Sequence, residues 1–184
     1  MAEDREMFGS DAQDVSSTLR DVATGAYILT ALAAPSPNLA DKSKGLMVGA
    51  STMILDGFVS RGLKDLIKRE RPNERNDRSM PSGHASIAAS RTTMAMRNLE
   101  AINMPDWTRQ MTNWSLRGVA LGSGFARVEA NKHYLSDVLV GYALGNFVAN
   151  FMYNAFMEGD SELPSITFQP AQGGGAFTFT IPVH

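Results

Sequence analysis

The sequence predicts an all-α fold, a single-domain helical bundle followed by a short β-like segment. Long stretches of helix-forming residues alternate with turn signals rich in proline and asparagine. The chain has 184 residues, of which 43% are hydrophobic and 20% charged, enough for one domain with a buried core. We therefore expect a helical domain over residues 1–158, with residues 159–184 as a β-like hairpin or tail packed on it or extending from it.

Turn signals place the individual elements. "APSPN" (34–38) and "INMPD" (102–106) separate neighbouring helices, and "RPNERNDRSMPSG" (71–83) reads as a charged loop bounded by prolines. After residue 158, two stretches alternate apolar and polar residues around "PAQGGG", as a hairpin does. The expected helices cover residues 11–33, 44–70, 83–101, 106–128 and 134–157.

One segment is long and apolar enough to cross a bilayer. Residues 138–157 contain no charged residue over twenty positions. However, Asn146, Asn150 and Asn154 recur every four residues and form one polar stripe, which favours a helix packed inside a protein. We expect a soluble helical domain rather than a membrane-embedded one, and peripheral membrane contact is left open.

Charge and cysteine content narrow the functional classes. The formal net charge is −2 and there is no cysteine, so disulfides and thiolate metal sites are excluded. The near-neutral balance gives no reason to expect nucleic acid as a partner. Residues 1–14 are charged and do not resemble a secretory signal. If the protein is exported, we expect its signal segment to be absent from this chain.

A basic segment precedes the charged loop. In "KDLIKRERP", Lys64 and Arg71 are seven residues apart, which places them on one helix face together with Lys68, and Pro72 is expected to end the helix. Two cations at a helix end can hold an anion, with Arg71 offering a planar fork. A solvated basic helix end is the alternative.

The stretch "SMPSGHAS" (79–86) predicts a helix start that carries a histidine. Pro81 disfavours helix before it, and Ser82 is a favoured N-cap residue. Gly83 and His84 then lie in the first turn, where unpaired N–H groups and the helix dipole attract anions.

A third segment, "ARVEANKHYLSD", contains Arg127, His133 and Asp137. With a helix in its second half, Asp137 lies one turn beyond His133 and can accept an imidazole N–H, which makes the other nitrogen a better nucleophile. A surface His–Asp pair is the alternative. A metal site of His84, His133 and Asp137 is less favoured, because no close histidine pair or carboxylate cluster supports it.

Together the three segments resemble the three-part signature of the type 2 phosphatidic acid phosphatase superfamily. The pattern is Lys-x6-Arg-Pro (64–72), Pro-Ser-Gly-His (81–84) and Arg-x5-His-x3-Asp (127–137), in that order. This superfamily includes lipid phosphatases, class A acid phosphatases and vanadium haloperoxidases. One position departs, because Ala126 stands where the family often has serine. The resemblance implies the helical core shared by these phosphatases and haloperoxidases.

The resemblance also implies roles for these residues. His133 would attack phosphorus to form a phosphohistidine, Asp137 would orient it, and His84 would act as the acid and then the base. The phosphate-binding residues would be Lys64, Arg71, Ser82, Gly83 and Arg127. No metal or other cofactor is expected, since these cations take the role of a metal, and vanadate could bind as a phosphate analogue.

The expected function is a metal-independent phosphatase acting on phosphomonoester or pyrophosphate groups. Its expected substrates are lipids or phosphorylated small molecules. The alternatives are a vanadate-dependent haloperoxidase and a non-catalytic anion-binding module. The resemblance further implies a periplasmic location or the outer face of a membrane.

Overall fold

The all-α bundle is confirmed by a computed structural model, which describes residues 2–36, 39–157, 165–171 and 174–180. The elements are α1 (Ala2–Ala33), α2 (Leu39–Ile67), α3 (Gly83–Ala101), α4 (Asp106–Glu129), α5 (Leu135–Phe156), β1 (Ser165–Ala171) and β2 (Gly174–Thr180). The two strands form an antiparallel hairpin in which Ser165 pairs with Thr180. A β hairpin in the tail is thus present. The division into two domains at residue 158 stays a prediction, and residues 158–164 and His184 lie outside the described residues.

Three predicted helix boundaries are wrong. The first helix already begins at Ala2 rather than at residue 11. The second begins at Leu39 rather than at residue 44 and ends at Ile67 rather than at residue 70. Lys68 then takes a left-handed backbone conformation with φ of 47°. The residues that follow pair with the loop instead: Arg69 accepts the Ser79 N–H at 2.8 Å, and Arg71 donates its N–H to the Asn76 carbonyl at 3.0 Å. These loop hydrogen bonds replace the last helical turn.

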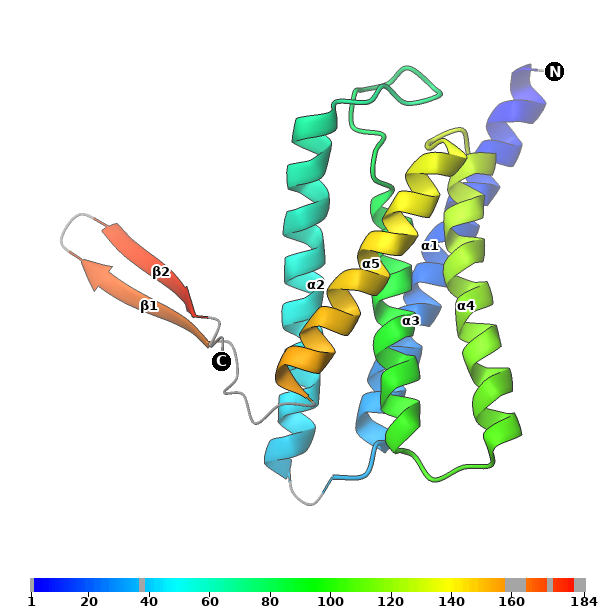
Figure 1. The fold of residues 1–184 in the computed structure, drawn as a ribbon. Helices are drawn as coiled ribbons and strands as arrows, with labels where there is room; N and C mark the ends of the chain where they lie inside the picture. The colour runs from blue at the N-terminus through cyan, green and yellow to red at the C-terminus, as the bar shows by residue number, and fades with distance from the viewer. Residues whose placement is uncertain (1, 37–38, 158–164, 172–173, 181–184) are drawn as a thin grey trace.

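Helix α3 is the central helix of the bundle and packs against α1, α2, α4 and α5. Figure 1 shows the loop between α2 and α3 at the same end of the bundle as the beginning of α5. All three predicted functional segments therefore converge on this end. The fold positions them without any sheet in the helical part of the described chain.

Two glycines let α5 approach α3 closely. A Cβ atom at Gly141 would lie within 3.0 Å of the Ser82 carbonyl oxygen, and one at Gly145 within 3.0 Å of the Ser86 carbonyl oxygen. Both carbonyls belong to the start of α3, so neither can move away easily. Glycine at these positions is therefore required by helix packing, and it brings the beginning of α5 beside the His84 segment.

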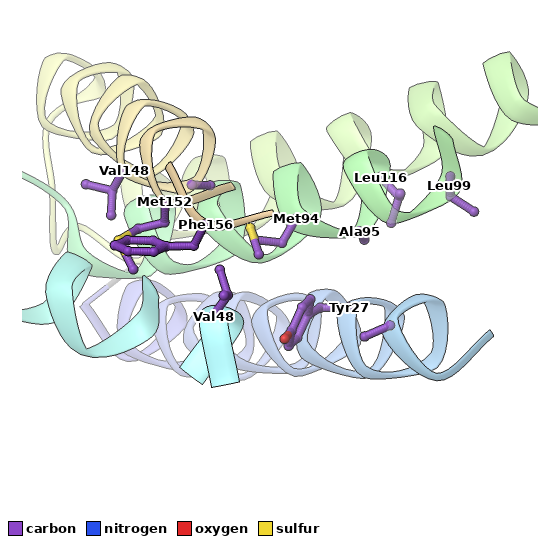
Figure 2. Close-up of a cluster of buried hydrophobic side chains, with 11 residues drawn as sticks. Tyr27, Val48, Met94, Ala95, Leu99, Leu116, Val148, Met152 and Phe156 are labelled. Atoms are coloured by element: carbon purple, nitrogen blue, oxygen red, sulfur yellow. The ribbon is translucent and has the colours of Figure 1, made fainter. Parts of the chain in front are cut away.

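The apolar core lies in the half of the bundle away from the charged loop. Figure 2 shows Met152 and Phe156 of α5 packed near Val48 of α2, with Tyr27 of α1 and Met94 of α3 beside them. Closer to the functional segments, small and polar side chains fill the interior. The buried polar residues include Ser16, Thr52, Asp56, Ser60, Ser86, Ser90, Thr92, Thr93 and Ser123.

The polar stripe of α5 runs along the edge of its contact with α3, with Asn146 and Asn150 half-buried and Asn154 exposed. Asn146 accepts a hydrogen bond from Thr93, and Asn154 accepts one from Arg97, both on α3. Beside this stripe, α5 exposes large apolar side chains, with Phe147 at 69% exposure. The helix thus contributes large apolar side chains both to the buried core and to the outer surface.

Candidate active site

Asp137 links the charged loop to the beginning of α5. Its Oδ1 accepts a hydrogen bond from Arg69 Nη1 at 2.8 Å, in an ion pair, and its Oδ2 accepts one from the Ser79 hydroxyl at 2.5 Å. The backbone N–H of Tyr134 also donates to Oδ2, at 2.9 Å. Since the carboxylate is fully buried, these charge-assisted hydrogen bonds fix the loop against the helix.

His133 lies beside Asp137, as the sequence predicted. Its Nδ1 is 3.7 Å from Asp137 Oδ2, which is beyond hydrogen-bond distance. The imidazole is buried, and among the described residues Nδ1 has no hydrogen-bond partner. The two residues are thus brought together, but the expected hydrogen bond is not formed.

Lys64 holds the loop as well as contributing charge. Its Nζ donates to the carbonyl oxygens of Pro81 and Arg78, the latter at 3.1 Å. Burial, followed by the charge of Arg71, lowers the pKa of Lys64 to about 8. The ammonium group therefore lies next to the Pro-Ser-Gly-His segment, and its N–H groups already donate to backbone carbonyl oxygens there.

Arg71 reaches the site from the loop and not from a helix face. Because α2 ends at Ile67, the predicted two-turn alignment with Lys64 is wrong. The Arg71 guanidinium instead donates through Nε to the Asn76 side chain at 2.8 Å. Its charge still acts on Lys64, His84 and His133, so the loop delivers the predicted cation by another route.

Ser82 occupies the N-cap position of α3, but its side chain makes no capping hydrogen bond. This corrects the predicted capping role. The hydroxyl is buried and has no hydrogen-bond partner in the described part of the chain, so it is free to donate to a ligand. A Cβ at Gly83 would meet nothing closer than the Ser60 hydroxyl at 3.8 Å. Packing therefore does not require Gly83, in contrast to Gly141.

Arg127 brings a buried cation to the same place from the last turn of α4. Only 7% of the residue is exposed, and its Nε has no hydrogen-bond partner among the residues that the structure describes. A buried guanidinium nitrogen without a partner is costly unless an anion is bound there. The charge of Arg127 acts on both His84 and His133.

Both histidines are held neutral. Burial, then the charges of Arg127 and Arg20, lowers the pKa of His84 to about 4. Burial, then the charges of Lys64, Arg71 and Arg127, holds the pKa of His133 well below its ordinary value. An uncharged imidazole at position 133 can act as a nucleophile, and the surrounding cations favour an anion in the space they share.

Acid should destabilise the protein through these histidines. The unfolded chain binds a proton at His84 near its ordinary pKa of 6.5, whereas the folded chain does so only near 4. The stability gained from neutral His84 is complete above 6.5 and is lost as the pH falls toward 4. Urea unfolding across this range should show a smaller loss in His84→Gln than in the wild type. Identical pH profiles for the two proteins would contradict the burial of a neutral His84.

Three residues of the site were missed by the sequence analysis: Arg69, Ser79 and Arg20. Arg69 stacks over the Tyr134 ring at 4.2 Å and pairs with Asp137, and Arg20 on α1 lies 3.5 Å from His84. Arg69 lies in the same basic stretch as Lys68 and Arg71, and only the conformation of the loop directs its side chain toward Asp137. The spacing of residues in the sequence does not indicate that direction. Arg20 is far from every motif in sequence.

The protein is a helical bundle in which His84 and His133 lie near buried cations, Arg127 among them. Among the described residues, Ser82 Oγ and Arg127 Nε of this site have no hydrogen-bond partner. No group of three or more metal-ligating histidine, aspartate or glutamate side chains occurs among the described residues. The PAP2 superfamily model matches residues 45–159, well over half of the chain. The chain belongs to the PAP2 superfamily.

One curated protein and one solved structure are similar to parts of this chain. The lipid A 1-phosphatase of Porphyromonas gingivalis is 32% identical over 117 residues, which make up 61% of this chain and 24% of that protein. The chain thus spans about a quarter of that relative's length. A transmembrane PAP2-type phosphatidylglycerolphosphate phosphatase from Bacillus subtilis has a TM-score of 0.46 and 22% identity, covering 79% of this chain and 84% of its own.

Proposed function

We propose that this protein is a metal-independent phosphatase of lipid phosphates that works through a phosphohistidine. The observation that carries the proposal is the pair of buried polar atoms without partners among the described residues, Ser82 Oγ and Arg127 Nε, in the cationic site beside His133. A phosphoryl group supplies what each of these groups lacks. Family membership and the lipid phosphatase relative support the same reaction class.

The chemistry starts with neutral His133 attacking phosphorus. A nitrogen–phosphorus bond forms as the bond to the leaving oxygen breaks, and His84 gives its proton to that oxygen. The bound phosphate's negative charge raises the pKa of His84 above its ligand-free value, so the acid is charged when it is needed. Arg71, Arg127 and Ser82 stabilise the oxygens of the transferred group.

Hydrolysis of the intermediate reverses the role of His84. Now neutral, it takes a proton from a water molecule that attacks phosphorus, and the bond to His133 breaks. Asp137 lies 3.7 Å from His133 and stabilises the positive charge on the phosphorylated ring. Inorganic phosphate is then released.

Phosphate release in EDTA tests this proposal. Purified protein is incubated with a panel of lipid phosphates, prenyl diphosphates and p-nitrophenyl phosphate. Release without metal, together with an acid-labile, base-stable phosphoprotein in quenched reactions, is expected. If no substrate releases phosphate, vanadate binding and peroxide-dependent halide oxidation separate the haloperoxidase alternative from a non-catalytic module.

The outer surface supports lipid contact. Exposed apolar side chains run along α2 and α5, which pack against each other. They include Met47, Ile54, Phe58, Leu139, Phe147 and Phe151. Helix α5 is also the helix found long and apolar enough to cross a membrane within the described residues. We propose that this apolar face contacts a bilayer, which would bring a lipid substrate to the site. Placement at the periplasmic or outer side is part of the same proposal.

Charge on the apolar face should weaken membrane binding. We expect the wild type to float with phosphatidylcholine vesicles and Phe147→Asp to bind them about tenfold or more weakly. Burying a phenyl ring in the bilayer would stabilise the bound state by roughly 1.5–3 kcal/mol, and the variant lacks that ring. Thr18→Asp, an equal charge change at an exposed position of α1, is the matched control. A wild type that stays entirely with the unbound fraction would refute lipid contact through this face.

A further inference from the structure

Arg20 stands beside the proposed acid although it lies outside the segment that matches the family model, residues 45–159. Its Nη1 is 3.5 Å from Nε2 of His84. The side chain is 29% exposed, so a ligand entering the site can reach it. Helix α1 thus contributes a cation that the three sequence motifs do not contain.

The structure holds Arg20 in a definite orientation. Its Nε and Nη2 donate to Asp21 Oδ1 at 3.0 and 2.8 Å, which leaves Nη1 turned toward His84. The carbonyl of Arg20 accepts the Thr24 hydroxyl at 2.9 Å. Asp21 is 65% exposed, and an ion pair in such a position is weak, so it does not neutralise Arg20 toward the site.

A reciprocal clamp fixes α1 against α4 close to Arg20. The Ser16 hydroxyl donates to the Ser123 carbonyl at 2.8 Å, and the Ser123 hydroxyl donates to the Ser16 carbonyl at 3.0 Å. Both serines are fully buried. Arg20 and Arg127 each follow a clamp residue by one helical turn, so the register between these two cations is set by the fold.

The position of Arg20 determines which part of a substrate it meets. His84 protonates the leaving oxygen in the proposed reaction, so groups beside His84 face the leaving group and not the transferred phosphoryl group. A guanidinium gains nothing from an uncharged alcohol there, but it can form charge-assisted hydrogen bonds with a second phosphate.

We propose that Arg20 is a specificity residue that binds the second phosphate of a diphosphate substrate. This inference rests on the proposed phosphatase function. His133 attacks the terminal phosphorus, the bond from that phosphorus to the bridging oxygen breaks, and the bridging oxygen takes the proton of His84. The leaving group is then a monophosphate held by Arg20.

The charge around the site fits a ligand with more than one phosphate. Arg20 and Arg71 both act electrostatically on Arg127, and Arg75 and Arg71 act on Lys132 next to His133. These cations repel one another. In the proposed reaction a single phosphate would be held at His133, and the second phosphate of a diphosphate would lie on the His84 side, where Arg20 stands.

Matched substrates test this role. Values of kcat/KM are measured for farnesyl diphosphate and farnesyl monophosphate with the wild type, Arg20→Gln, Arg20→Lys and Arg61→Gln. Arg61 is an exposed arginine of α2 and serves as the control for loss of one positive charge. We expect Arg20→Gln to lower the ratio of diphosphate to monophosphate kcat/KM about 10- to 100-fold, Arg20→Lys to recover part of it, and Arg61→Gln to keep it.

Loss of both activities by the same factor in Arg20→Gln, or an unchanged ratio, would overturn the inference. Titration calorimetry with inorganic pyrophosphate and phosphate separates it from the proposed function. A wild type that releases no phosphate but binds pyrophosphate more tightly than phosphate, with the preference lost in Arg20→Gln, would refute the phosphatase and retain Arg20 as the second-phosphate site. Equal preference in both proteins would refute the role of Arg20.

Discussion

Replacing His133 by alanine is expected to abolish phosphate release in EDTA, with kcat falling by about a thousandfold or more. Alanine removes the nitrogen that would form the covalent intermediate, and no other histidine replaces it, because His84 is proposed to face the leaving oxygen. The cations and Ser82 remain, so substrate binding should change far less than turnover. The phosphoprotein seen in quenched wild-type reactions should be absent from the variant.

Two controls make this result specific. His184→Ala removes the histidine to which no role is assigned and should keep full activity. Circular dichroism of His133→Ala should match the wild type at assay temperature, while its unfolding temperature should fall because a buried imidazole is removed. If phosphate release survives in His133→Ala, the nucleophile is a different residue and the proposed mechanism is wrong.

The residue types of the site could be predicted because they are contained in three short motifs. Arg127, His133 and Asp137 approach one another through a helix end and a short turn, and the local spacing carries that information. The order of the motifs then indicated the shared site. The structure adds how they meet: Asp137 is held by Arg69 and Ser79 of the loop, at a separation of 58 residues or more.

Other features depended on long-range contacts that single-sequence patterns do not contain. The end of α2 at Ile67 follows from hydrogen bonds between the backbone of Arg69 and Ser79, which a proline-based rule cannot anticipate. Arg20 reaches His84 across 64 residues because α1 packs on α3. Serine was a reasonable capping residue at position 82, but tertiary structure leaves its hydroxyl uncommitted.

The exposed apolar side chains of α5 could not be predicted from the asparagine stripe of that helix. Asn146 and Asn154 do accept hydrogen bonds from side chains of α3, but Asn154 is itself exposed. The spacing of the asparagines does not reveal which residues lie beside them. Phe147 and Phe151 directly follow two asparagines of this stripe, and both are exposed. A polar stripe can therefore accompany a lipid-facing surface as readily as a solvent-facing one.

Gly145→Ala is expected to lower the free energy of unfolding by about 3 kcal/mol or more, at the upper end of the cost of overpacking. The added Cβ would approach the Ser86 carbonyl oxygen and the Ser90 backbone nitrogen to 3.0 Å or less. Both atoms belong to the backbone of α3, so relief requires α5 and α3 to separate rather than one side chain to rotate. Urea unfolding measures the change.

Gly118→Ala is the matched control for this prediction. Gly118 also lies in the interior of a helix, but a Cβ there would meet no atom within 4 Å. Alanine should stabilise the protein at this position by about 0.4–1 kcal/mol, because it restricts the unfolded chain. Opposite signs for the same substitution would locate the cost of Gly145→Ala in the α3–α5 contact and not in helix propensity. Equal effects at both positions would contradict this contact.

The same substitution should also impair catalysis, because Ser86 lies one turn after Ser82 in the first turns of α3. The Ser82 N–H donates to the Asp137 carbonyl oxygen at 2.9 Å. Separation of α5 from α3 would break this hydrogen bond. That bond connects the His133 segment to the His84 segment. The proposed nucleophile and acid are thus held in position by a helix contact that only glycine permits. Activity and stability should both fall in Gly145→Ala, and neither should fall in Gly118→Ala.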